Sequence, residues 1–172
     1  MMAEVPTKLV ASHPTVRSDY HLEEIVEAGI ALTGTEIKSL RAAAPNLKDA
    51  FVEVQATKRA TKSTKKGAGK ATSLEAWIVN LHIAPYSHGN IWNHEPRRRR
   101  KLLLHTHQLN RMYGAIIQDG MTIVPTRMYL KGGICKVEIA LAKGKKKHDR
   151  REDMKRRSAE REISIATKRD RR

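Results

Sequence analysis

The sequence predicts a mainly β domain: an OB-type, closed antiparallel barrel with two to three flanking helices and a basic, disordered C-terminal tail. Apolar and polar residues alternate in several short stretches, as they do in half-buried strands. One longer stretch repeats apolar residues at helical spacing, which predicts a helix between two of the strands. Residues 143–172 are a charge run with few apolar residues. The alternation by itself is equally compatible with a β-sandwich.

The first third of the chain predicts a flexible start, a strand and a short helix. Residues 1–15 show no hydrophobic period, so we expect a flexible N-terminus before a domain spanning residues 16–142. From Tyr20 onwards the pattern alternates with apolar residues on both faces, which predicts a strand. Thr35 is placed to cap a short helix that Pro45 ends.

The next stretch predicts a long hairpin. Residues 50–55 and 74–83 form matching apolar runs, which predicts two paired strands. The connection, residues 56–73, contains Lys, Thr, Gly and Ala but no large apolar residue, so we expect a disordered basic tip.

The strongest helical pattern covers residues 105–119, where apolar residues fall at i, i+3, i+4, i+7 and i+8. Thr106 is a candidate cap and Gly120 a candidate stop. Residues 121–131 and 134–142 then predict two strands joined by a tight glycine turn. Because only 4% of the residues are aromatic, the core is expected to be mostly aliphatic.

The charge of the chain predicts a polyanionic partner. The formal net charge is +16 and the pI is about 10.3, values typical of proteins that bind nucleic acid or anionic lipid. The cations gather in residues 58–70, 97–101 and 143–172, and the rest of the chain is close to neutral. The tail lacks the aromatic anchors and broad apolar face of a membrane-binding helix, which favours nucleic acid.

Two features indicate a cytoplasmic protein. Cys135 is the only cysteine, so no intramolecular disulfide can form, and its place in an alternating apolar run predicts a buried strand residue. The N-terminus lacks a signal-peptide pattern, and no stretch approaches the roughly 20 apolar residues that span a bilayer.

The sequence does not favour catalysis, a cofactor or a bound metal. There is no second cysteine to complete a typical zinc site, and no Gly-rich phosphate loop or nucleophile motif stands out. Two alternatives to a dedicated RNA-binding protein remain open on residue types. One is a ribonuclease that uses His82 or His105, and the other is a general ribosomal or rRNA-assembly protein.

Two local features bear on RNA binding. The basic run of residues 97–101 follows Asn90, Trp92, Asn93 and His94, which offer stacking and hydrogen-bonding groups, so we expect this segment to contact RNA. Glu36 lies at a helix start, where it is either a partner of the helix dipole or an acceptor for the amino groups of unpaired bases.

Seven sequence blocks resemble the small protein B family, also called SsrA-binding proteins. They occur in the family's order and together cover nearly the whole chain from Arg17 to the tail. The blocks are GTEIKSLR (residues 34–41), NLKD (46–49), HIAPY (82–86), GN (89–90), NH (93–94), RKLLLH (100–105) and LAKGKK (141–146).

The resemblance implies an OB-fold protein that binds the tRNA-like domain of tmRNA (SsrA RNA) and delivers it to stalled ribosomes for trans-translation. The tmRNA-binding residues it implies are Glu36, Lys38, Arg41, Asn46, Gly89, Asn90, Leu103 and Lys136. It also implies a tail that is disordered when free, becomes helical on the ribosome and probes the empty mRNA channel near the decoding centre. The tail residues implied are Lys143, Lys145, Lys146, His148, Asp149, Arg150 and Arg151. The chain departs from the family in the longer, more basic segment of residues 56–73, whose role the resemblance does not assign.

Overall fold

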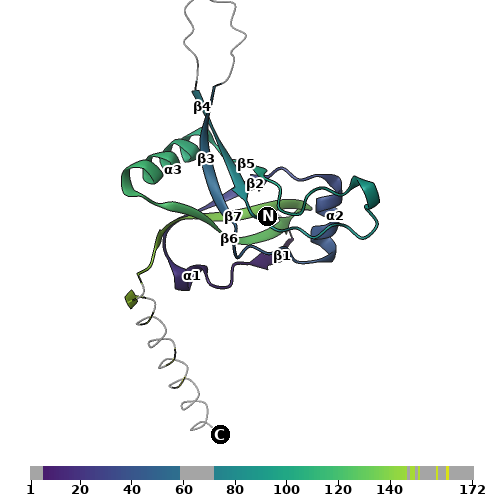
Figure 1. Cartoon of the computed structure of the whole chain (residues 1–172), viewed down its shortest axis with the longest axis horizontal. Coiled ribbons are helices and arrows are strands. Elements are labelled where there is room, and N and C mark those ends of the chain that lie inside the picture. Colours follow the sequence, from purple (N-terminus) through teal and green to yellow (C-terminus); the bar gives the residue numbers. More distant parts are fainter. Residues whose placement is uncertain are drawn as a thin grey trace, which may run out of the picture.

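Seven antiparallel strands form one sheet in the computed structural model of the chain, with helices at its margins (Figure 1). The structure describes residues 6–58 and 72–146, together with residues 148, 149, 151, 158 and 162. The strands are β1 Thr7–Ser12, β2 Tyr20–Ile30, β3 Phe51–Lys58, β4 Thr72–Val79, β5 Arg100–Leu103, β6 Thr122–Lys131 and β7 Ile134–Gly144. The helices are α1 Val16–Asp19, α2 Gly34–Ala42, the 3-10 helix η1 Asn90–Trp92 and α3 Thr106–Asp119.

The sheet closes on itself. The strand order is β1-β6-β3-β4-β5-β2-β7, and β7 also pairs with β6, so the pairing runs round a ring. One edge of β6 pairs with β7, and the other edge pairs with two strands in turn. On that second edge, Ile123 near the start of β6 pairs with Val52 of β3, and the second half of β6 pairs with β1. The predicted mainly β class, with a closed antiparallel sheet and flanking helices, is confirmed.

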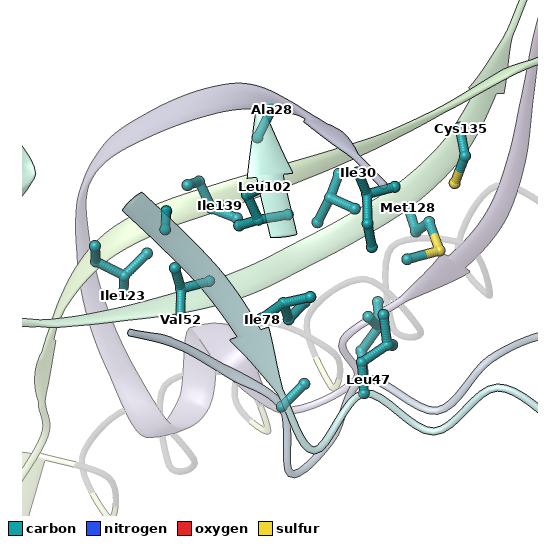
Figure 2. Packing of buried hydrophobic residues seen from close by; sticks show 14 of the residues in the cluster. Ala28, Ile30, Leu47, Val52, Ile78, Leu102, Ile123, Met128, Cys135 and Ile139 are labelled. Atoms are coloured by element: carbon teal, nitrogen blue, oxygen red, sulfur yellow. The ribbon is translucent and has the colours of Figure 1, made fainter. Parts of the chain in front are cut away.

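The core inside the ring is aliphatic, as the low aromatic content of the sequence predicts. Figure 2 shows side chains from several strands converging, and Ile78, Ile123 and Ile139 are fully buried there. Helices α2 and α3 contribute Leu40 and Met112 to the same cluster. Full burial of one such side chain stabilises the fold by roughly 1.5–3 kcal/mol, so this cluster is the main source of stability.

The expected flexible N-terminus is wrong for residues 7–12, which form β1 on the free edge of β6. The strand is only six residues long and its side chains are mostly exposed, so no clear alternation marks it in the sequence. Its stability comes from backbone pairing with a distant segment and from the contact of Val10 and Ala11 with the core. The one-turn helix α1 was also missed, although Val16 is buried.

The hairpin is present, but its strand ends differ from the prediction. Pairing continues from residue 55 to Lys58 and from residue 74 back to Thr72, so both ends of the expected tip are strands. Residues 59–71, where disorder was expected, lie outside the described residues. Strand β4 stops at Val79 rather than at residue 83, because Asn80 adopts a left-handed conformation with φ 58°.

The helix caps also differ in part. Thr33, not Thr35, caps α2, and its backbone N–H donates to the Glu36 carboxylate at 2.9 Å. His105 caps α3 in place of Thr106. The predicted stop at Gly120 is confirmed by its left-handed φ of 61°, a conformation that glycine adopts without strain.

The tail begins as an extension of the sheet. Strand β7 continues to Gly144, which pairs with Tyr20, and the Lys145 N–H donates to the Asp19 carbonyl oxygen at 2.9 Å. The described residues 148, 149, 151, 158 and 162 have helical backbone. Most of residues 147–172, including Arg150, lie outside the described part, so the expected disorder of the free tail stays a prediction.

Candidate nucleic-acid interface

One row of residues crosses five strands on the outside of the ring. Gly29 of β2 pairs with Leu103 of β5 and with Lys136 of β7, Lys136 pairs with Tyr129 of β6, and Tyr129 pairs with Leu9 of β1. Paired residues of antiparallel strands point to the same face, so these five residues form one continuous outer row. The structure thereby brings together Leu103 and Lys136, which lie 33 residues apart in the sequence.

Gly29 allows the Leu103 side chain to approach β2 closely. A Cβ atom on this residue would lie 3.2 Å from the Leu103 Cβ, closer than ordinary van der Waals contact. Because Gly29 has no side chain, Leu103 can lie across β2, where it remains 58% exposed. The result is an exposed apolar side chain on the same face as Lys136, with only the side-chain-free Gly29 between their two positions in the row.

Glu27 lies two residues before Gly29 and therefore on the same face. The Tyr129 hydroxyl donates to its carboxylate, and the Lys136 Nζ lies 3.5 Å from its Oε1. The hydrogen bond from Tyr129 lowers the pKa of Glu27; burial opposes this, and Lys131 and Lys136 lower it further. Burial and the bond to Glu27 raise the pKa of Tyr129 to about 12, so the tyrosine keeps its proton and the carboxylate stays ionised at neutral pH.

Glu27, like Leu9 and Tyr129, is a residue of this face that sequence reasoning missed. Strand alternation placed it on one face of β2, but nothing local indicated partners from β6 and β7. With it, the face offers a cation for phosphate, an exposed aliphatic side chain for base or ribose contact, and an acceptor for base amino groups. Such a combination suits looped or unpaired RNA, whose base edges are accessible.

Glu36 does not belong to the outer row. It is 6% exposed, and its carboxylate accepts hydrogen bonds from Arg98 Nε at 2.8 Å, Arg98 Nη2 at 2.6 Å and Arg100 Nε at 2.9 Å. Burial raises the pKa of Glu36, but the bonds from Arg98, from the Thr33 N–H and from Arg100 outweigh it and lower the pKa to about 2. The carboxylate is thus an internal anion with its acceptor sites occupied, and a base could reach it only by displacing an arginine.

The expectation that the basic run of residues 97–101 contacts RNA as a whole is not supported by its geometry. Arg100 is fully buried, and its guanidinium also donates to the carbonyl oxygens of Leu81, Arg98 and Pro96. Most of the run forms ion pairs with carboxylates far away in the sequence, and only Arg97 is exposed without such a pair among the described residues. The pairs are Arg98–Glu36, Arg99–Glu53, Arg100–Glu36 and Lys101–Glu75.

The remaining predicted residues of the barrel lie at α2 and the loop beside it. Lys38, Arg41 and Asn90 are exposed, and the Lys38 Nζ lies 5.8 Å from the centre of the Tyr86 ring. Asn46 forms a backbone bridge with His82. Gly89 is buried in a position where a Cβ atom would lie 2.4 Å from the Asn93 Oδ1. Gly89 therefore shapes the backbone, whereas Asn46, like Lys38, Arg41 and Asn90, is exposed to solvent, and its Oδ1 accepts a hydrogen bond from the Lys48 N–H at 2.9 Å.

Among the tail residues, Lys143 and His148 are exposed, and the Lys146 N–H donates to the Asp149 carboxylate at 3.2 Å. In the described part of the chain, no group of three or more histidine, cysteine, aspartate or glutamate residues is arranged to hold a metal ion. No helix within the described ranges has the length and apolarity needed to cross a membrane.

Comparison with known proteins gives one consistent family. A family model described as "SmpB protein" matches residues 10–169. A curated "SsrA-binding protein" of Geobacillus thermodenitrificans is 46% identical over 92% of each chain, and one of Pelobacter propionicus is 48% identical over 94% of this chain and 95% of its own. A solved structure described as "tmRNA-SmpB: a journey to the center of the bacterial ribosome" is 41% identical, covers 80% of this chain and 85% of that chain, and has a TM-score of 0.57. The chain, with its closed sheet and its outer row, therefore belongs to the SmpB family of SsrA-binding proteins.

Proposed function

We propose that this protein binds tmRNA (SsrA RNA) and delivers it to stalled ribosomes for trans-translation, in the cytoplasm. The single observation that carries the proposal is the outer row, because it joins Leu103 and Lys136 on one exposed face of a chain of this family. The relatives are SsrA-binding proteins, and the similar solved structure is a tmRNA–SmpB complex by its description.

The outer face would act by fitting the tRNA-like domain, without making or breaking a bond. Lys136 would neutralise a backbone phosphate, Leu103 would contact a base or ribose, and Glu27 would both orient Lys136 and accept a hydrogen bond from a base. Lys38, Arg41 and Asn90 would add contacts from α2 and its loop. Glu36 would support the interface indirectly, by holding Arg98 and Arg100 in place.

The experiment that tests this function compares binding to tmRNA with binding to an ordinary tRNA over a range of salt concentrations. A binder driven only by phosphates loses affinity for both RNAs equally as salt rises. We expect tmRNA to keep its advantage at high salt, and Leu103→Ala to remove most of it. Ile117→Ala is the matched control, since Ile117 is 63% exposed on α3. Equal affinity for both RNAs at all salt concentrations would contradict tmRNA recognition and favour a general rRNA-binding protein.

We further propose that the tail acts on the ribosome rather than on tmRNA. Lys143, Lys145 and Lys146 would neutralise rRNA phosphates, while His148 would stack on a base of the decoding centre. A variant ending at Lys146 keeps the pairing of Gly144 and the bond from Lys145 to Asp19. We expect it to bind tmRNA normally and to lose peptide tagging in a reconstituted translation assay. Equal loss of both activities would argue against this division.

A further inference from the structure

The loop between β4 and β5 displays two large apolar side chains that no contact described above explains. Ile91 is 81% exposed and Trp92 is 73% exposed, the highest fractions among the exposed large apolar residues of the described chain. They are consecutive residues of the 3-10 helix η1. An exposed tryptophan is unusual unless it serves a binding site, because its burial is worth more than that of most side chains.

The tip of this loop is held by specific bonds. The Asn93 side chain accepts a hydrogen bond from the Tyr86 N–H and donates one to the Tyr86 carbonyl oxygen, both at 3.0 Å. Gly89 leaves the space that this amide occupies, since a Cβ atom there would clash with it. Asn90 adopts a left-handed φ of 39°, a conformation that asparagine tolerates better than most residues and that turns the chain into η1.

The base of the loop is fixed to the barrel. The Pro96 carbonyl oxygen accepts a bond from the Arg100 guanidinium at 3.0 Å and one from the Ile83 N–H at 3.1 Å. On the other side of the loop, the Ser39 hydroxyl of α2 donates to the Ala84 carbonyl oxygen at 2.5 Å. The exposure of Trp92 is therefore a property of an ordered loop, and the buried Glu36–Arg100 pair contributes to that order.

The surroundings of the loop indicate the chemistry of its partner. Arg97 is exposed in the same loop, as is the acidic Glu95, and Lys38 of α2 lies against the loop, with its Nζ 5.8 Å from the centre of the Tyr86 ring. A flat aromatic ring beside cations is the usual means of binding an unpaired nucleotide, because the ring stacks on the base while the cations meet the phosphates.

We propose that Trp92 stacks on an unpaired base of tmRNA, with Ile91 adding apolar contact beside it. This inference rests on the proposed function and extends it to a second contact, away from the outer row. It also gives a role to the arginines that do not face solvent. Arg98 and Arg100 bind Glu36 and the Pro96 carbonyl oxygen and so order the loop, while Trp92 contacts the RNA.

Fluorescence gives a direct test, because the chain has only two tryptophans, Trp77 and Trp92. In Trp77→Phe, the remaining Trp92 should emit as a solvent-exposed indole, and saturating tmRNA should quench that emission strongly. The matched variant Trp92→Phe keeps only Trp77, which is half-buried between β-strand neighbours, and its emission should change little.

Affinity gives an independent test. Loss of one base–aromatic stack corresponds to weakening of roughly fivefold to a hundredfold, so we expect Trp92→Ala to bind tmRNA on the order of tenfold more weakly and Trp92→Phe to keep most of the affinity. The loss should be the same at every salt concentration, because no phosphate contact is removed. Lys38→Ala should instead reduce the slope of log affinity against log salt by about one. Ile117→Ala on α3, at the other side of the sheet from α2 in Figure 1, should have no effect.

The outcomes separate this inference from the proposed function. Unchanged affinity of Trp92→Ala for tmRNA, with unquenched Trp92 emission in the complex, would overturn the stacking contact and leave tmRNA binding intact. Quenching by ribosomes but not by tmRNA would also overturn it, since the occupant would then be a ribosomal component. Failure of the unaltered protein to prefer tmRNA would refute the proposed function and the inference together.

Discussion

Replacing Glu36 with glutamine tests whether the buried carboxylate supports the fold. The substitution keeps the size and shape of the side chain but removes its charge. In the folded protein Arg100 is fully buried, so it would lose the anion that compensates its own charge. We therefore expect a large loss of stability although no apolar contact is removed.

The size of the loss follows from two independent arguments. Lowering the pKa of Glu36 from its ordinary value of 4.5 to about 2 corresponds to about 3 kcal/mol of stabilisation at neutral pH. Removal of one partner of a buried ion pair costs roughly 3–5 kcal/mol in other proteins. We expect Glu36→Gln to lower the free energy of unfolding by about 3 kcal/mol at pH 7.

The pH dependence provides the sharper measurement. Because the pKa is lower in the folded state than in the unfolded state, the stabilisation is complete above pH 4.5 and disappears as the pH falls toward 2. The difference between the unaltered protein and Glu36→Gln should therefore shrink to about 1 kcal/mol at pH 3. Urea unfolding followed by circular dichroism, at several pH values between 7 and 3, measures this difference.

Glu53→Gln is the matched control. Its carboxylate also pairs with an arginine, Arg99, at 2.6 Å, but the two side chains are 37% and 48% exposed. An exposed pair contributes at most about 1 kcal/mol, so this variant should lose little stability. The reasoning would be refuted if both variants lost the same stability, or if the loss in Glu36→Gln did not change with pH.

Three further predictions follow from the geometry. Gly29→Val should force Leu103 away from β2 and weaken tmRNA binding at least several-fold, measured by gel shift, because even a Cβ atom would lie 3.2 Å from the Leu103 Cβ. Lys136→Ala should reduce the salt slope of tmRNA binding by about one, and an unchanged slope would show that it meets no phosphate. Gly120→Ala should destabilise the protein by about 1 kcal/mol because its φ is 61°, whereas Gly114→Ala inside α3 meets no atom within 4 Å and should stabilise it slightly; thermal unfolding of both measures the contrast.

Elements with strong local patterns could be predicted from the sequence. The apolar stripe predicted α3, and the two glycines of the tight turn predicted the hairpin of β6 and β7. Both patterns involve residues that are close together in the sequence. The cap of α2 was also readable: Thr33 and Glu36 have the spacing of a capping box, which the prediction overlooked in favour of Thr35.

The rest depends on partners distant in the sequence. The arginine run looks like a solvent-facing RNA contact until the fold brings Glu36, Glu53 and Glu75 beside it, from 26 to 64 residues away. Strand β1 likewise has no recognisable pattern in the sequence, because it forms by pairing with the free edge of β6. Neither event leaves a local pattern, so the run of cations was interpreted from its sequence neighbours and residues 7–12 from their lack of a hydrophobic period.

Strand β7 links two functions by its length. Lys136 lies near its beginning and Gly144 at its end, and the eight residue steps between them span about 26 Å of extended chain. Pairing with β2 on one side and β6 on the other holds that segment within the sheet. The position of Lys136 on the RNA therefore also determines where the basic tail begins, because both lie on the same paired strand.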